Sequence, residues 1–108
     1  IALTYGQFFF LLALDRLEQS KQPYHATDDG VAKEMELLVN GSRTFGYPAI
    51  YQFSDEMEEK GFTQEQIVKR PDGNQVTTYK LTPVGHLHLG KIYALNSKKL
   101  EPYKGLAI

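Results

Sequence analysis

The sequence has 108 residues, which is the size of one compact domain with a single hydrophobic core. Hydrophobic residues make up 42% and charged residues 23%, a balance that excludes an intrinsically disordered chain. The formal net charge is −1 and cysteine is absent, which excludes a strongly basic protein and a disulfide scaffold.

The first predicted element is a helix that begins after Thr4, a residue type favoured at helix N-caps, and runs to about Gln19. Its apolar residues nearly encircle the axis, so we expect burial on more than one side. The apolar run 8–14 is far shorter than the roughly 20 residues of a membrane span. The first residues lack the basic start of a signal peptide, and with no cysteine in the chain we expect a cytoplasmic protein without a membrane partner.

Two further helices are predicted in the middle of the chain. One follows Thr27 and ends at Asn40 and Gly41, residue types that favour helix ends. The next begins at Pro48 and stops at Gly61. In this third helix the apolar positions recur at helical spacing and are expected to face the core, namely Ile50, Phe53 and Met57.

The pattern then changes to that of a β-hairpin. Segments 66–70 and 75–81 alternate in polarity and are rich in β-branched residues, and the turn sequence 71–74 separates them. Thr82 and Pro83 suit the start of a fourth helix, which we expect to run to about Ser97. Residues 1–108 are therefore predicted to form a single domain, with 98–108 as a loosely ordered tail.

The order helix, helix, turn, helix, hairpin, helix predicts an α+β fold, mainly α, of the winged helix-turn-helix type. Two stretches carry a resemblance to a known family: 46–51 with 56–62, and 79–85, which reads Tyr-Lys-Leu-Thr-Pro-Val-Gly. They resemble the recognition helix and the exit from the wing in PadR- and MarR-like winged-helix regulators. The resemblance covers roughly residues 45–95 and implies dimeric DNA binding, usually by a transcriptional repressor. Met57 departs from the usual leucine, and residues 19–44 follow no pattern of the family.

Charge placement favours a DNA-binding face. Residues 40–54 contain no acid and hold groups that donate to phosphates or contact base edges. We expect DNA contacts from Ser42, Arg43, Thr44, Tyr47, Tyr51 and Gln52 in this stretch, and from Lys69, Arg70 and Gln75 in the hairpin. A simpler interpretation makes the tyrosines half-buried packing residues and makes Lys69 and Arg70 protection for an exposed strand edge.

The surplus apolar faces of the first and last helices predict a homodimer. We expect its interface to include Phe8, Leu12, Leu89, Ile92 and Tyr93.

The sequence contains no nucleophile elbow and no glycine-rich phosphate loop, so we expect neither catalysis nor a cofactor. His86 and His88 are two apart on a predicted helix and point to different faces, so we expect no metal site from them. Asp28 and Asp29 are explained as acids in the first turn of a helix.

Three functions remain. The first is a dimeric, sequence-specific regulator of transcription that places helix 48–60 in the major groove and wing 66–81 on the backbone or in the minor groove. The second is a DNA-binding adaptor of a plasmid partition system, which spreads along DNA and recruits a partner protein. The third is a winged-helix domain that binds only proteins, for which the net charge of −1 is the best argument.

Overall fold

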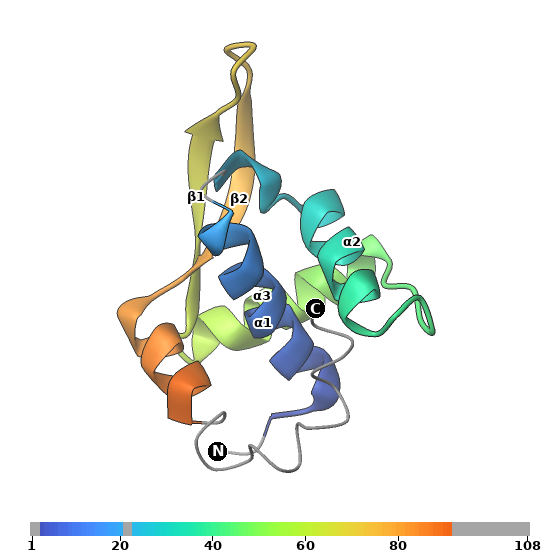
Figure 1. Ribbon diagram of the computed structural model, residues 1–108. Coiled ribbons are helices and arrows are strands. Elements are labelled where there is room, and N and C mark those ends of the chain that lie inside the picture. The colour runs from blue at the N-terminus through green and yellow to red at the C-terminus, as the bar shows by residue number, and fades with distance from the viewer. Residues whose placement is uncertain (1–2, 21–22, 92–108) are drawn as a thin grey trace.

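The computed structural model describes residues 3–20 and 23–91 (Figure 1). In chain order the elements are α1 (Tyr5–Gln19), the 3-10 turn η1 (Pro23–His25), α2 (Asp28–Leu38), α3 (Tyr47–Glu59), β1 (Thr63–Lys69) and β2 (Gln75–Leu81). Residues 83–91 are again helical. The fold is mixed and mainly helical, with one two-stranded antiparallel sheet, and its element order is that of a winged helix-turn-helix. No helix in the described part of the chain has the length and apolarity to cross a membrane.

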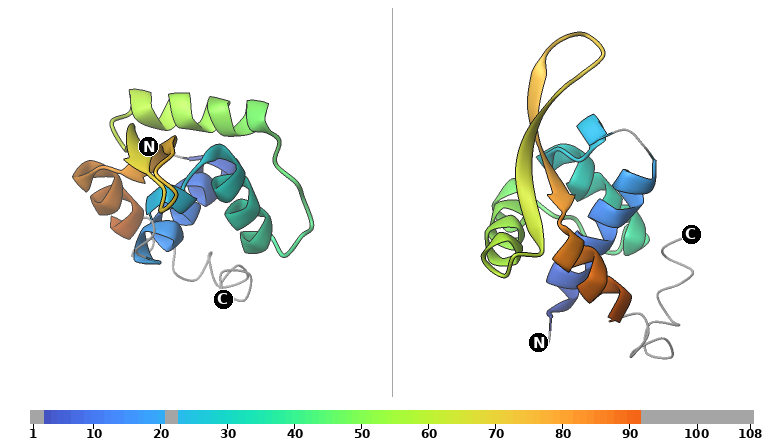
Figure 2. Two further views of the ribbon diagram at one scale, coloured as in Figure 1. Left: turned by 90° about the horizontal axis from the view of Figure 1, so that it is seen from above. Right: turned by 90° about the vertical axis from the view of Figure 1, so that its left-hand side faces the viewer.

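Helix α1 occupies the centre of the molecule (Figure 2). It begins as predicted, because the Thr4 hydroxyl accepts a hydrogen bond from the Gln7 backbone while the Gln7 side chain accepts one from the Thr4 backbone. All seven residues from Phe8 to Leu14 are buried. This burial follows from contacts with α2, α3 and β2, and it confirms the expectation of a helix covered on more than one side.

The next two helices lie close to their predicted bounds. Thr27 caps α2, and the chain leaves that helix through Asn40 and Gly41, both with positive φ. Helix α3 begins one residue before Pro48 and ends two residues before Gly61. Its buried residues are Ile50, Ser54 and Met57, while Phe53 is only partly buried.

The hairpin is longer than predicted. The sequence indicated a first strand from Gln66, but β1 begins at Thr63, which pairs with Leu81 at the far end of β2. The added residues 63–65 lack the β-branched alternation that identified the rest of the strand, and they are held in the sheet by pairing with residues 79–81. The turn at 71–74 is confirmed, with Gly73 at positive φ.

The last helix starts where Thr82 and Pro83 predicted. The Thr82 hydroxyl accepts a hydrogen bond from the Gly85 backbone and donates one to the Gly61 carbonyl, which fixes the helix start against the end of α3. The predicted helix end at Ser97 and the predicted tail 98–108 lie outside the described residues.

Candidate nucleic-acid interface

Every residue predicted to contact DNA is exposed. Two separate groups result. One follows the loop before α3 and the first half of that helix, and the other lies at the outer end of the hairpin, where Lys69 pairs with Gln75. Figure 1 shows the hairpin projecting beyond the helices, so the two groups lie on different parts of the molecule. DNA that contacts both must extend from α3 to the wing.

The α3 group contains a pair of stacked tyrosines. The rings of Tyr47 and Tyr51 lie 6.5 Å apart with 29° between their planes, and the side chains are 52% and 50% exposed. They are one helical turn apart and so share a face of α3. About half of each side chain is thus open to solvent, which leaves room for DNA contact and for packing alike.

The only cation of this group stands beside α3. The Arg43 guanidinium lies 5.3 Å from the centre of the Phe45 ring, and its side chain is exposed. Helix α3 itself holds no lysine or arginine, and its four acids follow Ser54. One of them, Glu56, accepts hydrogen bonds from Gln52 and from Gln7, which directs its carboxylate along the helix toward α1. The front of α3, residues 47–54, therefore contributes exposed polar and aromatic side chains and none that is charged.

An acid that the sequence explained only as a first-turn residue organises this surface. The Asp28 carboxylate, at the start of α2, accepts a hydrogen bond from the Tyr79 hydroxyl on β2. Its negative charge also raises the pKa of Tyr51 on α3. The backbone of Tyr79 donates to the Ala26 carbonyl as well. Asp28 thus joins the start of α2 to the wing and faces one of the two stacked tyrosines, and its charge is favoured by the N-terminus of α2.

We expect Tyr79→Phe to lower the free energy of unfolding by about 1–2 kcal/mol, because the hydrogen bond that it removes has a charged acceptor. The pKa of Tyr79 is raised by burial and then by Asp28, so its folded-state value lies above the ordinary value of 10.0. This contribution is complete below pH 10 and is lost as the pH rises beyond it. Urea unfolding at neutral pH and at alkaline pH measures both effects.

The matched control is Tyr51→Phe, which removes a hydroxyl near the same carboxylate from an exposed ring. We expect its unfolding midpoint to equal that of the unmodified protein. A Tyr79→Phe variant that unfolds at the same midpoint as the unmodified protein would show that the Tyr79 bond to Asp28 does not stabilise the fold.

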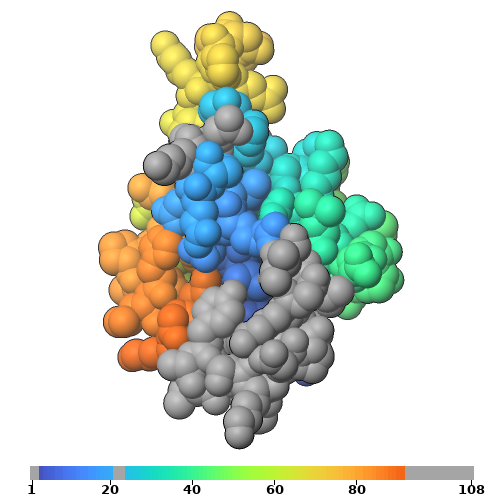
Figure 3. All heavy atoms as spheres, viewed as in Figure 1, coloured from blue at the N-terminus to red at the C-terminus, as the bar shows by residue number. Residues whose placement is uncertain are grey.

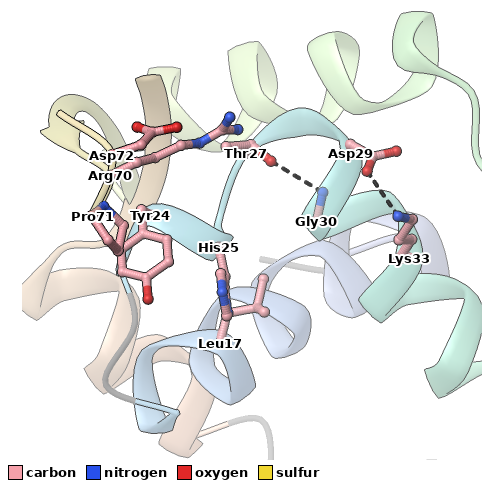
Figure 4. Close-up of a pocket in the computed structure, with 10 residues that line it drawn as sticks. All are labelled: Leu17, Tyr24, His25, Thr27, Asp29, Gly30, Lys33, Arg70, Pro71 and Asp72. Carbon is pink, nitrogen blue, oxygen red and sulfur yellow. Dashed lines mark hydrogen bonds and ion pairs between the residues drawn. The ribbon is translucent and has the colours of Figure 1, made fainter. Parts of the chain in front are cut away.

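The outer end of the hairpin borders a groove of about 550 Å³ (Figure 4). Arg70, Pro71 and Asp72 line one side of it, and Tyr24, His25 and the start of α2 line the other. The positive charges of Lys33 and Arg70 in this lining are balanced by the negative charges of Asp29 and Asp72, so the groove does not favour a ligand of one charge. Arg70 lines this groove and is exposed to solvent.

The predicted dimer interface stays a prediction. Phe8, Leu12 and Leu89 are at most 5% exposed in the single chain, so their burial has an intramolecular explanation. Ile92 and Tyr93 lie outside the described residues. Within residues 83–91, the large apolar side chains that are exposed are Val84 and Leu87, which the sequence did not single out for the interface.

Comparison with known proteins supports the fold. No protein-family model and no curated protein matches the chain. The solved structure of a proposed transcriptional regulator from Thermoplasma acidophilum is similar, with a TM-score of 0.60 and 22% sequence identity over 91% of each chain. At this identity the likeness shows a shared fold, and the resemblance to PadR- and MarR-like proteins stays a prediction.

Proposed function

We propose that a chain with this regulator-like fold is itself a regulator of transcription, which binds duplex DNA as a homodimer in the cytoplasm and catalyses no reaction. The observation that carries the proposal is the front of α3. It combines exposed stacked tyrosines, an acid-free approach through residues 40–54 and a neighbouring Arg43. In a winged helix-turn-helix this is the part of the recognition helix that enters the major groove.

We assign the base contacts and the phosphate contacts to different residues. Tyr47, Tyr51 and Gln52 offer hydroxyl, amide and ring edges to the bases, with no repulsive charge among them. Arg43, Lys69 and Arg70 are the candidate phosphate contacts at the two ends of the interface. With three such contacts in each subunit of a dimer, log affinity is expected to fall with log salt at a slope of about −5.

DNase footprinting on the DNA around this protein's own gene tests the proposal. The variant Arg43→Ala with Tyr51→Ala removes one cation and one stacked ring from the front of α3, and we expect it to lose the protected site. The control variant Lys60→Ala with Tyr5→Ala removes an exposed cation and an exposed tyrosine elsewhere, and it is expected to protect the same site.

A footprint that lengthens as protein is added would favour the partition adaptor over the regulator, because adaptor dimers bind side by side along DNA. A footprint of fixed length over a promoter supports repression or another regulatory role. The titration therefore separates the two DNA-binding functions without any further variant.

One observation favours the third function. Four acids and no lysine or arginine lie on α3, so its rear half is a negative surface that suits a basic protein. If no DNA is protected even at low salt, where the electrostatic attraction is strongest, the proposal of DNA binding is wrong and a basic protein partner is to be sought instead.

A further inference from the structure

A cluster of nitrogen and oxygen donors lies where the last helix meets α1. His86 Nε2 is 2.7 Å from Glu18 Oε2, and His86 Nδ1 is 3.9 Å from Asp15 Oδ1. One donor atom can be chosen from each of the three residues so that all three atoms lie within 4.8 Å of one another. They are the only such group of three histidines or acids among residues 3–20 and 23–91.

The fold holds the two halves of this cluster in place. Asp15 and Glu18 are three residues apart on α1 and so share a face. His86 belongs to the helix that Thr82 caps and that Gly85 allows to approach the Phe62 carbonyl. Figure 3 shows that last helix, in orange, lying directly against α1, in blue. The donors are therefore brought together by packed helices rather than by a loop.

The electrostatics of the cluster favour a cation. Both acids stand in the last two turns of α1, where the carbonyl end of the helix is already partly negative. In the part of the chain that is described, neither acid forms an ion pair with lysine or arginine, and the basic residue of that last turn, Arg16, pairs with Glu34 instead. The Gln19 amide donates to Asp15 Oδ2 at 3.0 Å, which leaves Oδ1 directed toward His86.

We propose that Asp15, Glu18 and His86 bind one divalent first-row transition metal ion, of which Zn²⁺ is the representative. One imidazole nitrogen and two carboxylate oxygens are a donor set that suits such ions, and three protein ligands leave a position for water. The metal replaces the close contact between His86 Nε2 and Glu18 Oε2 and ties the last helix to α1. Gln19 then acts as the outer partner that orients Asp15.

Isothermal titration of the full chain with zinc chloride, after dialysis against EDTA, tests this site. We expect one ion per chain, and a loss of affinity of more than about tenfold in Asp15→Asn and in His86→Gln, since even outer-shell partners change metal affinity about tenfold. The control is His25→Gln, because that exposed histidine lies in η1 outside the cluster. Its zinc affinity is expected to equal that of the unmodified protein.

Three results would overturn the proposal: no heat of binding up to millimolar zinc, unchanged affinity in both cluster variants, or loss of binding in the His25 variant. Asp15→Asn keeps the size of the side chain and an oxygen for Gln19, so it remains informative if His86→Gln fails to fold. Visible absorption of the Co²⁺ complex gives a second readout, and we expect the two cluster variants to lose it. None of these measurements involves DNA, so this site and the proposed function can fail independently.

Discussion

The variant Gly85→Ala is expected to lose about 3 kcal/mol of unfolding free energy, at the upper end of the usual range for overpacking. A Cβ atom at position 85 would lie 2.0 Å from the Phe62 carbonyl oxygen and 2.9 Å from its carbon. Both atoms belong to the backbone, which cannot turn aside as a flexible side chain can. The last helix must therefore move away from the start of β1, and urea unfolding measures the consequence.

Gly90 provides a matched control in the same helical stretch. Among the described residues, and apart from its chain neighbours and its own helix backbone, nothing lies within 4 Å of a Cβ built there, so Gly90→Ala adds the same methyl group without a clash. We expect it to raise stability by up to about 1 kcal/mol, because alanine favours the helix over glycine. If the two variants unfold alike, the close approach at Gly85 does not hold the helix in place.

The start of the last helix was predictable because its causes are local. Thr82 and Pro83 form a cap and a first turn from adjacent residues, and Thr4 with Gln7 does the same for α1. The exposed residues at the front of α3 were predictable for a similar reason, since their exposure follows from the helical spacing of the buried Ile50.

The features that the sequence did not reveal depend on contacts between distant segments. In the sequence, Asp28 has the features of an ordinary acid in the first turn of a helix. Its hydrogen bond from the Tyr79 hydroxyl exists only because β2 packs beside the start of α2. The spacing of His86 and His88 places them on different faces of a helix, and it gives no sign of Asp15 and Glu18, which lie on a helix at the other end of the described chain. No spacing rule connects residues that meet only through packing. The same applies to the first residues of β1, whose place in the sheet is set by their pairing with β2.

Phe10→Ala is expected to have the largest effect on stability, a loss of about 3–5 kcal/mol. Phe10 is fully buried, and its ring centre lies 6.2 Å from that of Phe53 on α3 and 5.9 Å from that of Tyr79 on β2. One side chain of α1 therefore packs against both α3 and the hairpin. Because a domain is stable by only about 5–15 kcal/mol, this cavity removes a large share of the total.

The same ring gives the prediction a consequence beyond stability. Cooling or a stabilising solute can restore folding of Phe10→Ala, but the folded variant still has a void where α3 and β2 meet α1. We therefore expect weaker DNA binding even in the folded variant. Leu37→Ala is the control, because Leu37 is 61% exposed on α2 and its truncation should change stability by less than about 0.5 kcal/mol. Chemical unfolding compares the two variants directly. An equal loss in both would mean that α1 is not the element on which α3 and the wing are supported.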